Sequence, residues 1–141
     1  MDDLLKAIIT KYNTTTGEDA TKALALRTAT PGGVWLNQAP QTESGTYIVV
    51  TVLDMSADYA MGTNATLYDG VIQFQFCGTT ATSVVTAKDA FIDLFKDNLL
   101  TCTSHTVRYA RPVSAGVLEK DIDSQGYILT LGMRFMVGTS T

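Results

Sequence analysis

The single histidine of the chain, His105, lies three residues after Cys102, and a thiol beside an imidazole is the pairing used in nucleophilic catalysis by cysteine. Such a site also needs a group that orients the imidazole and donors that stabilise an oxyanion, and the sequence shows neither near these residues. His105 instead alternates with Val107 and Tyr109, as residues of one face of a strand do. We therefore predict no catalytic residue, and we interpret His105 as a structural or surface residue.

The remaining groups with possible chemistry are equally incomplete. Cys77 and Cys102 form no CxxC motif, so two buried thiols are expected, with a disulfide as the alternative. Glu119, Asp121 and Asp123 could bind calcium, but they lack the ordered ligands and the closing Glu of an EF-hand loop, which favours a solvated turn. No phosphate-binding glycine loop is present. We predict neither a metal site nor a bound cofactor.

The charge balance limits the partners. Ten basic and fourteen acidic residues give a net charge of -4, and the basic residues are not clustered, which argues against tight nucleic-acid binding. An acidic wall can still let a DNA duplex pass without binding it. Charged residues make up only 17% of the chain, below the roughly 25% of ordinary soluble domains, and this favours a subunit partly covered by neighbours. An ordinary threonine-rich monomer is the alternative.

Membrane insertion and secretion are not expected. No apolar run approaches the roughly 20 residues that span a bilayer, and "MDDLLKAIITKYN" begins with acids rather than with the basic residues of a signal peptide. We expect synthesis in the cytoplasm of the host cell.

The elements that would position any site can be placed by periodicity. Apolar residues at three- and four-residue spacing predict helices over 2–12 and 79–100, and alternation predicts strands over 46–53, 67–77, 104–113 and 127–137. Residues 13–22 and 114–126 have the composition of loops, and "GGVWLNQA" that of a short edge segment. At 141 residues this predicts one α+β domain, 1–141, with an antiparallel sheet, two main helices on one face, and a hairpin loop protruding at 54–66.

Three groups of residues are candidates for contacts with other subunits. Trp35 could anchor an interface, although a core position is the alternative. The long 54–66 loop could order on assembly. In "LYDGVIQFQF", the Tyr68–Phe76 side should face the helices, while Asp69, Gln73 and Gln75 face solvent or a neighbour. The interface candidates are Trp35, Asp54, Asp58, Tyr59, Met61, Gln73, Gln75 and Arg134.

The order of these segments resembles a phage family. A short N-terminal helix, an extended segment ending in "NQAP", the strand "TYIVVTVLD", "LYDGVIQFQFCG" leading into "SVVTAKDAFIDLFKDNL", and a closing "GYILTLGMRFMV" strand are similar to the tail-terminator or tail-completion proteins of long-tailed bacteriophages. The resemblance covers about residues 2–137.

The resemblance implies a structural virion protein without enzymatic activity. It implies a homo-oligomeric ring, commonly a hexamer, at the junction of tail and neck, in contact with the tail-tube protein and a head-completion protein, with DNA passing through the lumen. Other phage neck or tail-tube subunits are close alternatives, and a small ligand-binding domain is an alternative from a different class.

Overall fold

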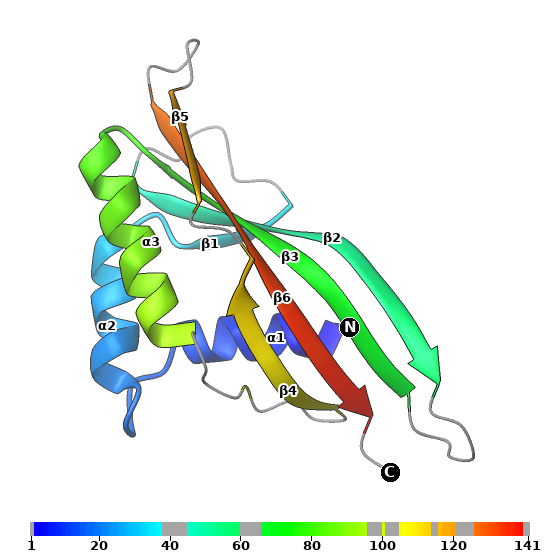
Figure 1. Ribbon diagram of the computed structural model, residues 1–141. Helices are drawn as coiled ribbons and strands as arrows, with labels where there is room; N and C mark the ends of the chain where they lie inside the picture. The colour runs from blue at the N-terminus through cyan, green and yellow to red at the C-terminus, as the bar shows by residue number, and fades with distance from the viewer. Residues whose placement is uncertain are drawn as a thin grey trace.

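The computed structural model describes residues 2–37, 45–59, 66–95, 100, 105–113, 116–120 and 126–139 (Figure 1). In chain order the elements are α1 (Asp2–Tyr12), α2 (Ala20–Ala29), β1 (Val34–Leu36), β2 (Tyr47–Tyr59), β3 (Thr66–Gly78), α3 (Ala81–Phe95), β4 (His105–Pro112), β5 (Val117–Lys120) and β6 (Tyr127–Thr139).

The strands form one sheet in the order β1-β2-β3-β6-β4, with β5 also paired to β6. Neighbouring strands are antiparallel except β1, which runs parallel to β2. The helices lie on one side of this sheet, and β2, β3 and β6 extend beyond them toward the lower right of Figure 1. The α+β class is confirmed. The sheet is mixed rather than purely antiparallel, and the described residues include three helices rather than two.

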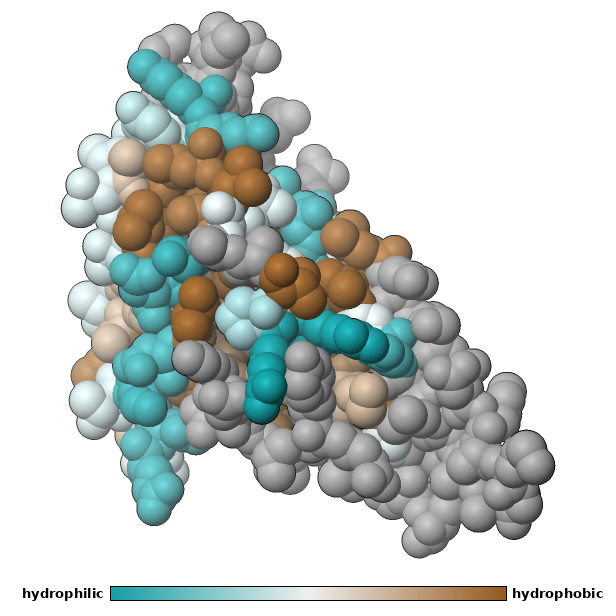
Figure 2. Space-filling model, viewed as in Figure 1, coloured by the Kyte–Doolittle hydropathy of each residue, from teal (hydrophilic) through white to brown (hydrophobic). Residues whose placement is uncertain are grey.

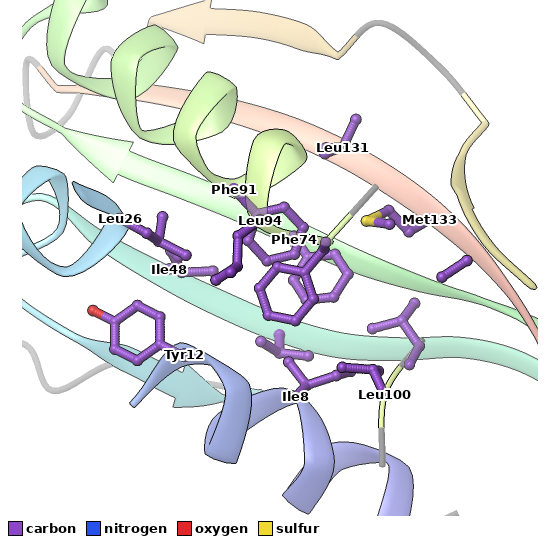
Figure 3. Close-up of a cluster of buried hydrophobic side chains, with 14 of the residues drawn as sticks. Ile8, Tyr12, Leu26, Ile48, Phe74, Phe91, Leu94, Leu100, Leu131 and Met133 are labelled. Atoms are coloured by element: carbon purple, nitrogen blue, oxygen red, sulfur yellow. The ribbon is translucent and has the colours of Figure 1, made fainter. Parts of the chain in front are cut away.

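The apolar stripes predicted for the first and last helices are buried. Leu4, Ile8 and Tyr12 in α1, and Phe91 and Leu94 in α3, are at most 8% exposed. Phe91 is central, with its ring centroid 4.5 Å from that of Phe74, 5.4 Å from Phe76 and 4.4 Å from Phe95. Figure 3 shows Phe91 and Phe74 side by side, between Leu26 on one side and Met133 on the other. These contacts fix which face of the sheet is covered.

Helix α2 was missed because its sequence has little amphipathic pattern. Only Ala23 and Leu26 of its residues are buried. Two buried positions are too few to produce a row of apolar residues at helical spacing in the sequence. Its Ala, Leu, Lys and Arg residues nevertheless favour helix. Arg27 Nη1 donates to the carbonyl oxygens of Tyr12 at 2.7 Å and Thr14 at 2.9 Å, so α2 satisfies carbonyls left open at the end of α1.

The predicted 54–66 loop is mostly strand. β2 continues to Tyr59 and β3 begins at Thr66, with paired backbone up to Tyr59↔Thr66. A register shift between Val52 and Asp54 interrupts the ladder once. These strand ends were not predicted because the segment contains Gly62 and Asn64 and shows no clear alternation of apolar and polar residues. Residues 60–65, where the hairpin tip was predicted, lie outside the described part.

Strand β5 was also missed, inside a segment predicted as loop. All four of its residues are exposed, so no alternation marks them in the sequence. The strand exists because β6 offers it a partner edge, with Val117 opposite Thr130 and Lys120 opposite Tyr127. Gly116 precedes it at φ 95°, a conformation that glycine adopts without strain.

Candidate assembly surface

The two faces of the sheet differ sharply in cover. Ile72, Phe74 and Phe76 are fully buried toward the helices, whereas Gln73 and Gln75, which alternate with them, are half-buried on the opposite side. We call this opposite side the open face. The prediction of which residues of "LYDGVIQFQF" face the helices is therefore correct for the described side chains. The side chain of Tyr68 lies outside the described part.

One row of residues crosses the open face from edge to edge. Strand pairing places Trp35 beside Val49, Val49 beside Gln75, Gln75 beside Thr130, and Thr130 beside Val117. Val49 is only 7% exposed although it is outside the main core cluster. The indole Nε1 of Trp35 donates to the carbonyl oxygen of Gly32 at 2.9 Å, which holds the half-buried ring at the sheet edge. Thus two interface candidates, Trp35 and Gln75, lie in one row.

The middle of the open face carries no charge among the described side chains. Alternation also places on it Thr51, Val71, Gln73, Cys77, Ile128 and Gly132. Depletion of charge, with aromatic and aliphatic groups between neutral polar ones, is typical of the centre of a protein interface. Figure 2 shows hydrophobic side chains interspersed with hydrophilic ones on the surface over β5 and β6.

Charged groups border this region on β3, β6 and β4. Arg134 Nε donates to Asp69 Oδ1 at 2.9 Å, and its Nη2 binds Asp69 Oδ2. Hydrogen bonding to Arg134 holds the pKa of Asp69 below its ordinary value of 3.8. Arg111 is paired directly with Arg134 across β4 and β6. Arg134 therefore lies on the open face with Gln73 and Gln75, but within an ion pair of its own chain.

The other interface candidates are separated from the Trp35 row. Asp54, Asp58 and Tyr59 lie in the part of β2 beyond the register shift, where they pair with Val71, Leu67 and Thr66. Met61 lies outside the described residues. Residues 54–59 therefore lie in strand β2 rather than in a loop, and their role in contacts with other subunits stays a prediction.

The candidate chemical groups form no site in the described part of the chain. Cys77 is half-buried rather than buried as expected. Glu119 is exposed in β5, and its companions Asp121 and Asp123 lie outside the described residues, as does Cys102. Within that part, no three His, Cys, Asp or Glu side chains are grouped to hold a metal ion. No described helix has the length and apolar character needed to cross a membrane.

A small apolar pocket lies between α1, α3 and the sheet. It is lined by Ile8, Tyr12, Val34, Ile48, Val50, Phe74, Phe91 and Phe95 and leaves no room for a water molecule. Ligand pockets usually hold roughly 300–1,000 Å³. This pocket is therefore a packing gap in the core rather than a binding site.

Some residues of the open face were missed as candidates. Val113 and Val117 are 54% and 57% exposed, at the edge of the sheet beside β6. The loop composition of 114–126 concealed the position of Val117, whereas Val113 was predicted as the last residue of the strand over 104–113 but was not chosen as a candidate. Ile128 could have been found, because it alternates with the buried face of the last strand.

Comparison with solved structures places this sheet and its helices among known folds. A chain from the virion of a native gene transfer agent particle matches with a TM-score of 0.64. The fold is shared with a virion chain. The match covers 85% of this chain and 91% of the gene transfer agent chain, at 13% sequence identity. No protein-family model matches the sequence, and no curated protein is significantly similar to it. At this identity the match shows the fold alone.

Proposed function

We propose that this chain is a structural, non-enzymatic subunit of a phage-like virion, and specifically the tail terminator that closes the tail tube and joins it to the head connector. The observation that carries the proposal is the fold shared with a virion chain over nearly the full length of both. The order of segments that resembles tail-terminator proteins supports the finer assignment.

In this role the chain forms a ring, with six copies as the expected number, at the junction of tail and neck. Its partners are the tail-tube protein and a head-completion protein, and DNA passes through the lumen without specific binding. The net charge of -4 supports such a passage. The uncharged middle of the open face, with Trp35, Gln73 and Gln75, supports contacts with neighbouring virion subunits.

Mass in solution tests the ring. Light scattering after size exclusion, across a concentration series, should give one discrete multiple of the 15.2 kDa chain. A series of growing masses without a limit would contradict a closed ring and favour a filament-forming subunit, such as one of the tail tube.

Binding to tail tubes separates the terminator from other neck subunits. The chain should cosediment with polymerised tube protein at a stoichiometry of one ring per tube end, independent of tube length. Binding along the whole tube, or to the head connector alone, would favour another tube or neck role. A matched pair of variants that each add one positive charge, Gln75→Arg on the open face and Thr86→Arg on the exposed side of α3, distinguishes specific from charge-driven binding. Only the first should weaken binding.

A small ligand-binding domain is the alternative from a different class. The core gap between α1, α3 and the sheet, which leaves no room for a water molecule, gives it no support. A chain that stays monomeric and ignores both tubes and connectors would contradict the virion role.

A further inference from the structure

Helix α2 is attached to the rest of the molecule by few buried side chains. Only Ala23 and Leu26 of its ten residues are buried, whereas α3 buries five of its fifteen. Leu24, on the outer side of α2, is 57% exposed. A helix of ten residues is marginal in water without packing, so its docking contacts decide whether α2 stays formed and in place.

The centre of the core does not depend on α2. The ring of Phe91 contacts Phe74 and so joins α3 directly to β3. Figure 3 shows Leu26 of α2 toward one end of the buried cluster, beside Ile48, with Phe74 in the middle. Withdrawal of α2 therefore removes one end of the core and leaves its aromatic centre in place.

Polar contacts from the last turn of α1 hold α2 at both ends. Lys11 Nζ lies 3.7 Å from Asp19 Oδ2 at the start of α2. Arg27 Nη1, in the last turn of α2, donates to the carbonyl oxygen of Tyr12 at 2.7 Å. The Tyr12 hydroxyl in turn lies 3.1 Å from the carbonyl oxygen of Thr30, just after α2. When such contacts open, their groups bind water instead, so the net contribution of each to stability is modest.

The chain has a boundary on each side of α2. Before the helix, residues 15–18 are exposed, and Gly17 adopts φ 86° with no atom within 4 Å of the place where a Cβ would be. After the helix, the amide of Gly32 donates to the carbonyl oxygen of Thr46 at 2.9 Å, and the pairing of β1 with β2 follows. Residues 15–31 therefore lie between a glycine in open space and a point where the chain is fastened to the sheet.

We propose that residues 15–31 form a lid that opens and closes as one unit while α1, α3 and the sheet stay folded. Segments with few buried apolar contacts open at a lower free energy than the whole fold. Opening breaks the hydrogen bonds of Arg27 and brings Ala23 and Leu26 into water, with Gly17 as the hinge. The lid follows from contacts within one chain, so it does not rest on the virion role proposed above.

Hydrogen exchange of the wild-type chain tests the lid without any substitution. In urea below the unfolding transition, amides of α2 should exchange at least about tenfold faster than the most protected amides of α3 and β3. Their exchange should also depend less on urea, because local opening exposes less surface than global unfolding does. The same free energy and the same urea dependence for α2, α3 and β3 would overturn the proposal.

Two variants that each remove one positive charge from α2 identify the contact that keeps the lid closed. Arg27→Gln removes the charged donor to the α1 carbonyl oxygens and should speed exchange in α2 by about tenfold. Lys22→Gln, at an exposed position of the same helix, should leave this exchange unchanged. Neither variant should change exchange in α3 or β3. If Arg27→Gln speeds exchange equally in α2 and α3, the helices open only with the whole fold and the lid is overturned.

Thiol labelling measures the same opening while the polar contacts are left intact. Ala23 in α2 and Ala87 in α3 are both fully buried, so Ala23→Cys and Ala87→Cys form a matched pair. The thiol at position 23 should react with a labelling reagent at least about tenfold faster than the thiol at position 87. Peptide mass spectrometry distinguishes both from the natural cysteines. Similar rates at the two positions in folded variants would overturn the lid.

Discussion

Arg134 in β6 binds Asp69 in β3 with both ends of its guanidinium fork, although the two residues are diagonal rather than directly opposite in the strand register. Bidentate pairs of this kind orient both side chains more strictly than a single hydrogen bond does. The pair is partly exposed, with 46% of the Arg134 side chain and 23% of the Asp69 side chain accessible. It therefore orders the border of the open face more than it stabilises the fold.

The first prediction concerns the pH dependence of this pair. Arg134 lowers the pKa of Asp69 in the folded state below 3.8, so the contribution to stability is present at neutral pH and is lost as the pH falls through the lowered value. Asp69→Asn should reduce the free energy of unfolding at pH 7 by up to about 1 kcal/mol. Urea unfolding of the wild type and of Asp69→Asn should differ less at pH 2.5. A double-mutant cycle with Arg134→Gln isolates the pair, and equal differences at both pH values would contradict the assignment.

The second prediction tests the aromatic centre of the core. Phe91→Ala should lower the free energy of unfolding by about 3–5 kcal/mol, because it removes contacts to Phe74, Phe76 and Phe95 and leaves a cavity. Val85→Ala, on the same helix but 37% exposed, should change it by no more than about 0.5 kcal/mol. Chemical denaturation measures both. Similar values for the two variants would mean that α3 does not pack on the sheet as described.

The third prediction concerns the link between α1 and the end of α2. The Tyr12 hydroxyl lies 3.1 Å from the Thr30 carbonyl oxygen and 2.7 Å from Thr30 Oγ1, which itself donates to the Leu26 carbonyl oxygen at 2.8 Å. Tyr12→Phe should destabilise the fold by about 1–2 kcal/mol, because it leaves a buried acceptor without this donor. Thr30→Ser keeps the hydroxyl and should cost less. Thermal unfolding with equal losses for the two would show that the hydroxyl is not what matters.

The fourth prediction concerns the buried lysine of α1. Lys11 Nζ lies 3.7 Å from Asp19 Oδ2 and 5.8 Å from the centroid of the Phe95 ring. Desolvation lowers the pKa of Lys11 from 10.5, partly offset by Asp19. Lys11→Met should be neutral or stabilising at pH 7, while Asp19→Asn should destabilise by about 1–2 kcal/mol because it leaves the ammonium without its partner.

The pH dependence of Lys11 has the same sense as that of Asp69, because both pKa values are lowered in the folded chain, but it belongs to the alkaline range. Because the folded pKa is below the unfolded one, the unfolded chain holds more protons as the pH approaches 10.5, and folding is favoured as the proton leaves. The stability of the wild type relative to Lys11→Met should therefore rise as the pH is raised toward 10.5. A fall in that relative stability would contradict the assigned burial of the ammonium.

Periodicity predicted the helices and strands in which apolar residues recur with the period of the element. The apolar stripe of α3 includes Phe91 and Leu94, and the apolar side of β3 includes Phe74 and Phe76. Both are buried where the helices pack on the sheet. Hydrophobic burial acts residue by residue with the period of the element, so the α+β class and the identity of the open face follow from the sequence.

The sequence did not predict the elements that depend on a partner far away in the chain. α2 exists with two described buried residues because Arg27 reaches carbonyls of α1, and β5 exists although exposed because β6 offers it an edge. The continuation of β2 through Asp54 and Asp58 likewise depends on the ladder with β3. A backbone hydrogen bond can be made by any residue with a partner in reach, so the sequence alone determined the faces of this protein, and only tertiary contacts decided the length of its strands.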